Sequence, residues 1–212
     1  MASLFRTDPT LKEYQRFRKV GRDLNHKIID SCLNETILAK ATTMLKLGRK
    51  GHLILDSEDD LSVLMDFALF EIRHPDGRNS VEQYTETKGG ANAIERELLA
   101  AMAQAQTGLY KVMQVLRDKQ QIVLENIITS EVPTVLTDIN FSQTMVIGLC
   151  IFFRPVSLSK FTMTSGIAFV FPSKLEQELG MYWKRLEIKG NAERYARFFR
   201  KSKQSGIETM YV

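Results

Sequence analysis

Hydrophobic residues recur near helical spacing through residues 10–47, which predicts one helix or two helices there. The positions that carry this pattern are Leu11, Tyr14, Phe17, Leu24, Ile28, Cys32, Leu38, Met44 and Leu45. Asn34 is placed to cap the second of two helices, and Gly48 and Gly51 end the region. Residues 52–55 form a short apolar stretch that fits a single strand or an extended connection. The start of the chain is therefore expected to be helical.

An acidic run, Asp-Ser-Glu-Asp-Asp at residues 56–60, precedes the next helical pattern. We interpret Asp56 or Ser57 as the N-cap and the acids after it as first-turn residues, because carboxylates complement the helix dipole. This helix is expected to run to about Arg73, where His-Pro-Asp-Gly at 74–77 stops it. Two further helices are expected at residues 80–86 and 94–106.

The pattern changes after Gly108, where β-branched and aromatic residues replace helix signals. Strands are predicted at 109–117, 121–128, 132–139, 145–154 and 161–170. Five short strands with brief connections favour a small closed barrel, SH3-like or OB-like. Alternation with a period of two would place Val112 and Leu116 on one face, and Ile122 and Leu124 on one face of the next strand.

Helices are expected again at residues 174–188 and, capped by Asn191, through Gln204. The fold class is therefore α+β: a helical N-terminal part, a small five-stranded β-barrel and C-terminal helices. The corresponding regions are a helical region at 1–105, the barrel at 106–172 and a C-terminal helical appendage at 173–212.

Composition places this chain among ordinary globular proteins. Its 212 residues are 44% hydrophobic and 25% charged, which excludes collagen-like and disordered classes. Cys32 and Cys150 lie far apart among apolar neighbours, as buried thiols in a reducing compartment would. The start of the chain has no signal-peptide pattern, and the longest apolar run, Met145–Phe153, is far too short to span a membrane. We expect a cytoplasmic protein of bacterial type with no membrane partner.

Charge is spread unevenly along the chain, whose formal net charge is +4. Residues 1–27 and 174–203 are basic, whereas residues 56–97 are strongly acidic. One interpretation is that the basic ends pair with the acidic middle or are simply solvated. The other is a basic surface for nucleic acid or another anionic partner.

No catalytic, cofactor or metal signature is present in the sequence. The acids of residues 56–66, with His52 and His74 nearby, could in principle hold a divalent cation, but a helix start explains the run and no HExxH or EF-hand spacing occurs. Ser142, Ser165 and Cys150 are surrounded by no nucleophile motif, and no phosphate-binding glycine loop exists. We therefore assign no catalytic residue, metal site or cofactor.

The segment GNAERYARFFRKSKQ near the C-terminus combines aromatic and basic residues. In a helix, Tyr195, Ala196 and Phe199 share one face, which suits docking on the core with the charges in water. The alternative is that its cations bind nucleic acid or another partner, since such rows neutralise phosphates. The candidate residues are Arg194, Arg197, Arg200, Lys201 and Lys203.

Two stretches, residues 53–84 and 109–131, followed by Arg154 and FTMTSGIAFVFP at 161–172, resemble a group of uncharacterised bacterial proteins. The resemblance implies a helical N-terminal part and a small β-barrel. Some of that group carry a cysteine-rich SEC-C zinc motif, which is absent here. The resemblance supplies no activity and no catalytic residue.

These observations predict a non-enzymatic binding or regulatory module with a protein or nucleic-acid partner. The alternative is an enzyme with a metal-assisted or acid/base site built from residues 56–66. The two differ in one observable feature. An enzyme should show a pocket where acids or a histidine converge, and a binding module should show a continuous basic or apolar surface.

Overall fold

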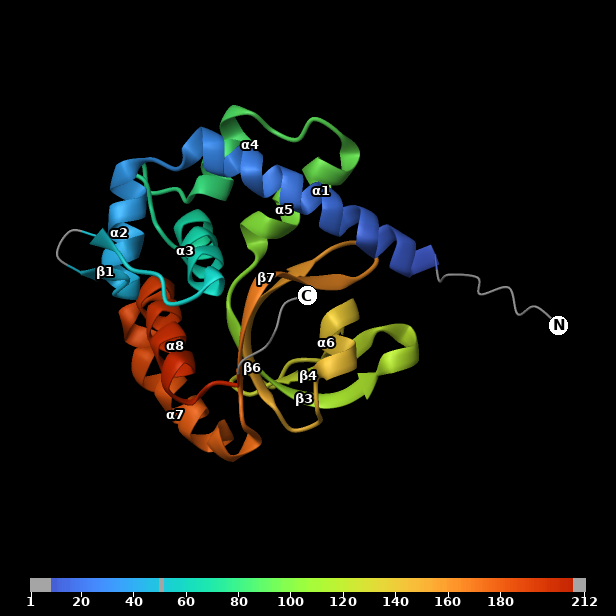
Figure 1. The fold of residues 1–212 in the computed structure, drawn as a ribbon. Coiled ribbons are helices and arrows are strands. Elements are labelled where there is room, and N and C mark those ends of the chain that lie inside the picture. The colour runs from blue at the N-terminus through green and yellow to red at the C-terminus, as the bar shows by residue number, and fades with distance from the viewer. Residues whose placement is uncertain (1–8, 50–51, 208–212) are drawn as a thin grey trace.

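The computed structural model describes residues 9–49 and 52–207, and it confirms the α+β class. Helices from both ends of the sequence surround one side of a five-stranded barrel, and α1 crosses the top of the molecule over the barrel end (Figure 1). The N-terminal elements are α1 (Pro9–Cys32), α2 (Glu35–Leu45), β1 (Gly48–Arg49), β2 (His52–Leu53), α3 (Glu58–Phe70), α4 (Ser80–Thr87) and α5 (Ala93–Gln104). The remaining elements are β3 (Gly108–Leu116), β4 (Gln121–Asn126), β5 (Thr134–Thr137), α6 (Ile139–Thr144), β6 (Cys150–Ser157), β7 (Thr162–Phe171), α7 (Glu176–Leu186) and α8 (Asn191–Ser205).

Side-chain caps fix several helix starts where the sequence placed them. The Asn34 side chain accepts a hydrogen bond from the Ile37 N–H at the start of α2. Asn79 and Glu82 form a reciprocal capping box on α4. Such caps satisfy backbone N–H groups that have no partner within the helix. Of the one or two helices expected in residues 10–47, the structure shows two.

The barrel closes in the order β3-β4-β5-β7-β6. All neighbouring strands are antiparallel except β5 and β7, which are parallel and share a single register pair, Leu136 opposite Thr162. The expectation of a small closed barrel is confirmed. Its interior holds Val112, Ile122 and Leu124, all fully buried.

Several details of the sequence reading of the barrel are wrong. A β-bulge between Val112 and Gln114 shifts the register, so Val115, rather than Leu116, packs against the barrel interior. Residues 145–149, predicted as strand, precede β6, and they follow a short helix, α6, that the sequence reading missed. Asp138 caps that helix through the Phe141 N–H, and its six residues are too few to show a helical period.

Three further boundaries differ from the sequence reading. Helix α3 ends at Phe70 rather than near Arg73. Strand β6 runs through Pro155, which was expected in a loop, and the strand tolerates it at a register shift. Gly190, rather than Asn191, occupies the N-cap position of α8.

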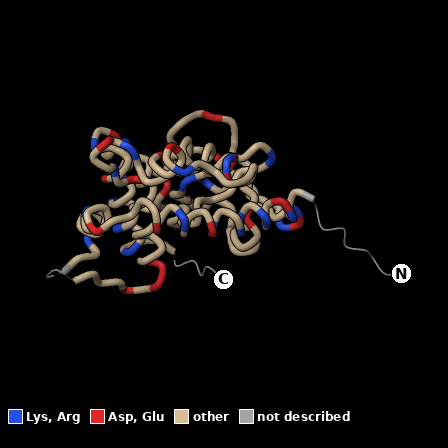
Figure 2. The backbone as a smooth tube through the Cα atoms, turned by 90° about the horizontal axis from the view of Figure 1, so that it is seen from above, with Lys and Arg blue, Asp and Glu red and all other residues tan. Residues whose placement is uncertain are grey.

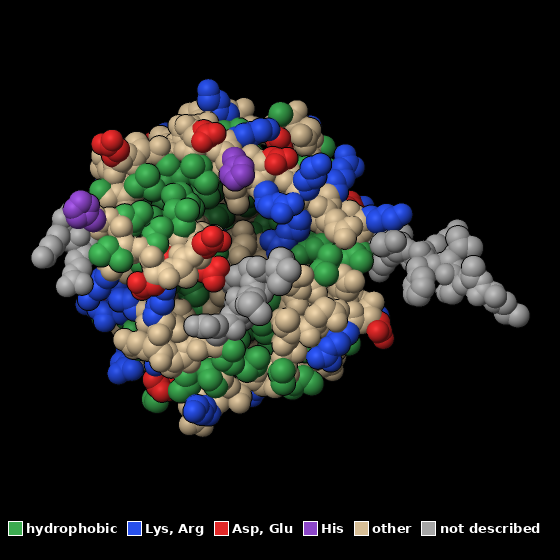
Figure 3. Space-filling model, in the orientation of Figure 1, with side chains coloured by type: hydrophobic (Ala, Val, Ile, Leu, Met, Phe, Trp, Pro, Cys, Tyr) green, Lys and Arg blue, Asp and Glu red, His purple; other side chains and the backbone are tan. Residues whose placement is uncertain are grey.

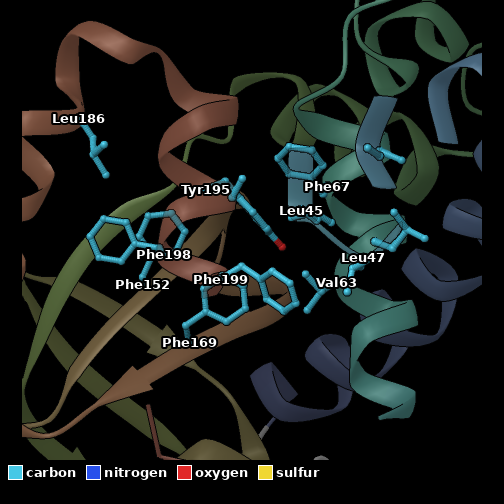
Figure 4. Close-up of a cluster of buried hydrophobic side chains, with 14 of the residues drawn as sticks. Leu45, Leu47, Val63, Phe67, Phe152, Phe169, Leu186, Tyr195, Phe198 and Phe199 are labelled. Carbon is cyan, nitrogen blue, oxygen red and sulfur yellow. The ribbon is translucent and has the colours of Figure 1, made fainter. Parts of the chain in front are cut away.

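The largest core cluster joins the outer face of the barrel to helices α2, α3, α7 and α8. Aromatic rings dominate this cluster (Figure 4). The ring centroids of Phe152 and Phe198, which are stacked, lie 4.4 Å apart, and those of Tyr195 and Phe67 lie 5.2 Å apart. A second cluster packs α1, α4 and α5 against the ends of β6 and β7. Both clusters combine residues from more than one predicted region, so the boundaries at 105 and 172 stay a prediction.

Candidate functional site

A cleft of about 1080 Å³ lies between α1, α3, α6 and β7. The residues that line it from α1 extend from Tyr14 to Ile29, about 22 Å of helix at 1.5 Å per residue. Figure 3 shows a hollow on one face of the molecule, with basic side chains along one side and hydrophobic side chains along another. A large concave site with apolar walls and a few polar groups is the usual form of a ligand site.

Arg18 fastens α1 to the barrel at one end of the cleft. Its Nη2 lies 2.8 Å from Asp138 Oδ2, and its Nη1 donates to the Thr164 carbonyl oxygen at 2.8 Å. Its Nε donates to the Tyr14 hydroxyl at 3.0 Å. These partners neutralise Arg18 and occupy most of its donors, so this residue positions α1 rather than offering a charge to a ligand.

The next turns of α1 carry basic side chains that form no ion pairs of the kind Arg18 forms. Arg22 and His26 follow Arg18 at intervals of four residues, line the cleft and are exposed. Arg16 and Lys19 lie on the adjoining solvent face of α1 and are also exposed. Within the described residues, no ion pair involves Arg16, Lys19 or Arg22. The α1 side of the cleft is therefore positively charged.

The other walls of the cleft are apolar and rich in methionine. Leu61 on α3 is 43% exposed and contributes to this surface, together with Ile167 of β7. The methionines that line the cleft are Met65, which is half-buried, and Met102, Met145 and Met163, which belong to the core and are at most 5% exposed. Methionine has a flexible, polarisable side chain that adapts to different ligand shapes. This surface therefore suits an apolar ligand face of variable shape.

A buried polar cluster lies where α3 meets the barrel. Arg154 of β6 pairs with Glu71 at 2.7 Å and lies 3.8 Å from Asp66 Oδ2. Ser165 of β7 donates to Asp66 Oδ1 at 2.9 Å, and the Tyr195 hydroxyl faces the same carboxyl without a hydrogen bond of normal geometry. Asp66 and Ser165 also line the cleft. This cluster links the cleft to α8.

Burial sets the ionisation of this cluster. Desolvation raises the pKa of Asp66 in spite of the nearby Arg154 guanidinium and the Ser165 hydrogen bond. Desolvation, reinforced by the Asp66 charge, raises the pKa of Tyr195 well above its ordinary value. Arg154 also stacks on the Phe70 ring, with 4.1 Å from its guanidinium carbon to the ring centroid. The cluster is thus a packed, strongly coupled part of the core.

The structure gives each cation of the candidate C-terminal row a contact within the chain. Its tyrosine and phenylalanine side chains enter the core, as the docking interpretation expected. Arg194 stacks on Trp183, Arg197 pairs with Glu193, Arg200 donates to the Met44 carbonyl, Lys201 pairs with Glu178, and Lys203 pairs with Asp60. Binding of nucleic acid or a partner by these residues stays a prediction.

The acids of residues 56–66 lie in two places: Asp56 and Asp60 face Lys203, whereas Asp66 lies beside Arg154 and Ser165. The run at 56–60 follows strand β2, and in Figure 2 it is the red stretch further along the segment that leads away from the grey gap. Asp60 is buried, accepts the Asp56 N–H at 2.8 Å and lies 2.5 Å from Lys203 Nζ. In the described part of the chain, no cluster of acids, histidines or cysteines could hold a metal ion. Ser57 is the N-cap of α3, although its side chain makes no capping bond.

Both cysteines are buried free thiols, as the sequence reading expected. Burial raises the pKa of Cys150 to about 11, so its reactive thiolate form is suppressed at neutral pH. Among the described residues, no helix is long and apolar enough to cross a membrane.

The chain belongs to a family of unknown function, DUF7986, whose profile matches residues 8–212. No curated protein and no solved structure matches the chain significantly. The resemblance to bacterial proteins that carry a SEC-C motif stays a prediction.

The cleft itself was missed by sequence reasoning. Its one visible signal is the spacing of Arg18, Arg22 and His26 on one side of a long helix. The sequence analysis treated these three residues only as part of the basic segment 1–27. The apolar walls come from segments more than a hundred residues apart, and no local pattern brings them together.

Proposed function

We propose that this protein is a binding module whose cleft holds an acidic, partly apolar segment of a partner protein. The observation that supports this proposal most strongly is the division of the cleft into two sides. Arg22 and His26 stand on the α1 side, and methionine and leucine side chains form the opposite walls. A partner segment with acidic and apolar residues would complement both sides.

The size of the cleft favours a segment of protein over a compact metabolite. Its α1 side is about 22 Å long, which exceeds the length of most small ligands, and its volume of about 1080 Å³ is at the upper end for small-molecule pockets. The acids at the cleft carry no spare charge: Asp138 is paired with Arg18, and Asp66 is buried beside Arg154. Among the described residues that line the cleft, Arg22 therefore carries a charge that no ion pair neutralises.

The alternative of an acid/base enzyme has less support, because Asp66 is the only acid of residues 56–66 that lines the cleft. Burial raises the pKa of this carboxyl. Nucleic-acid binding is the alternative partner class. It would require Arg194, Arg197, Arg200, Lys201 and Lys203 to exchange their contacts within the chain for phosphates. Filter binding of DNA and RNA at about 50 mM salt, where phosphate contacts are strong, tests it.

A selection from a phage-displayed library of random twelve-residue peptides, with the full-length protein as the target, tests the proposal. We expect enriched peptides to be acidic with several apolar residues, and to bind the Arg22→Glu variant at least tenfold more weakly. Lys184→Glu on α7 is the matched control, since Lys184 is exposed and outside the cleft, and it should bind like the wild type. Basic or uncharged consensus peptides, or equal binding to Arg22→Glu, would reject the proposal.

A further inference from the structure

Strand β7 has different neighbours on its two sides. Along one side it pairs antiparallel with β6, from Ser157 opposite Thr162 to Cys150 opposite Phe171. Along the other side, β5 meets it only where Leu136 lies opposite Thr162. Closure of the barrel therefore depends on one register pair. Past that pair, β5 no longer covers the second side of β7.

The uncovered length of β7 forms part of the cleft. Residues 163–167 and Val170 line the cleft from this strand. At the near end, Arg18 reaches the Thr164 carbonyl oxygen, so a backbone acceptor of β7 is turned toward α1. At Gly166 the backbone has a φ of +131°, and an added Cβ would meet no atom within 4 Å. The face of the strand toward which this Cβ would point therefore borders open space.

One extended residue already pairs with this edge. The N–H of Ile207, which follows α8, donates to the Val170 carbonyl oxygen at 2.8 Å in an isolated antiparallel bridge. Ile207 also lines the cleft and is 41% exposed. The bridge shows that Val170 can receive an added strand. Among the described residues, Ile207 thus marks the register of such a strand.

We propose that the partner segment binds in extended form, as an antiparallel strand added to the cleft-facing edge of β7, with Val170 as its backbone acceptor. This inference rests on the proposed function and specifies its binding mode. Unpaired strand edges bind extended peptides through main-chain hydrogen bonds, and the side chains select the sequence. Side chains of an added strand alternate between two faces. One face meets the methionine-rich wall and the other the cations of α1, so acidic and apolar residues should alternate.

Competition with Ile207 provides the test, made in the full-length protein. Ile207→Pro removes the N–H that donates to Val170, and Ile207→Ala keeps it as a matched control. The probe is a fluorescent peptide, Ser-Gly-Ile-Glu-Thr-Met-Tyr-Val, which copies residues 205–212. Fluorescence anisotropy should show at least tenfold tighter binding to Ile207→Pro than to Ile207→Ala. Thermal melts of both variants confirm that each is folded.

A second probe, N-methylated at its isoleucine, isolates the backbone hydrogen bond. It should bind Ile207→Pro at least tenfold more weakly than the unmodified probe. Equal binding of the two probes, or failure of the unmodified probe to bind Ile207→Pro, overturns strand addition. If acidic peptides from the display experiment still depend on Arg22 in that case, the cleft remains the binding site and only the extended mode is wrong.

Discussion

Asp66 is the residue where the cleft and the core meet. Its carboxyl accepts the Ser165 hydroxyl, faces Tyr195 and lies near Arg154, yet burial raises its pKa. A carboxyl whose folded-state pKa is raised stabilises the fold below its unfolded pKa, and that stability is lost as pH rises through the folded pKa. The wild-type protein therefore loses stability at this residue as pH increases from about 4.

Asp66→Asn should remove this loss. Relative to the wild type, the variant should become more stable as the pH is raised from about 4.5 to 8, whatever fixed cost the amide has in the cluster. Urea denaturation of both proteins across this range measures the difference in the free energy of unfolding. A difference that does not change with pH, or that moves in favour of the wild type at high pH, would contradict the assignment.

Leu124 shows how far residue patterns can be trusted in the barrel. Alternation predicted its inward face, and the structure buries it completely. Leu124→Ala should lower the free energy of unfolding by about 2–5 kcal/mol, because apolar contacts are lost and a cavity remains. Met113→Ala is the control, since Met113 is 40% exposed on the neighbouring strand, and it should change stability far less. Chemical denaturation compares the two, and a nearly neutral Leu124→Ala would be inconsistent with this core.

At the scale of elements, the sequence pattern predicted the helices and most of the strands correctly. It did not predict the structure of the connections between the strands. Asn34 caps α2 through a contact three residues away, so the sequence reveals it. The bulge at Val112–Gln114 and the short helix α6 depend on how the barrel closes. A short stretch of sequence carries no information about that closure. The cleft was missed for the same reason, because α1, α3 and β7 meet only in the folded chain.

The start of α3 gives a prediction about an element. Ser57 is its N-cap and the acids after it lie in the first turn, as the sequence predicted. One of these acids, Asp60, is buried and pairs with Lys203 of α8. Asp60→Ala should lower the free energy of unfolding by about 1–3 kcal/mol, since it removes a buried charged acceptor. Asp56→Ala, at an exposed side chain, should cost about 0.5 kcal/mol or less. Thermal melts rank the two, and the opposite order would disprove the role of Asp60.

At the scale of the whole molecule, the helical part and the barrel share their cores. Residues from α2, α3, β6, β7 and α8 form one aromatic cluster, and α1 is fastened to β7 by Arg18. We therefore expect one cooperative unfolding transition. Far-ultraviolet circular dichroism, which follows the helices, and tryptophan fluorescence, which follows Trp183, should give the same midpoint. Trp183 of α7 packs on Phe152 of the barrel, so two separated midpoints would show that this contact between helix and barrel is lost independently of the remaining helices.

The distribution of methionine allows the most direct test of the cleft as the binding site. Four methionines line it, whereas Met113 and Met181 are 40% and 60% exposed on other surfaces. In a protein labelled with ¹³C at the methionine methyl groups, an acidic peptide from the display experiment should shift the signals of Met65, Met102, Met145 and Met163. The signals of Met113 and Met181 should stay in place. Shifts confined to Met113 and Met181, or no shift at the four cleft methionines under saturating peptide, would contradict the account.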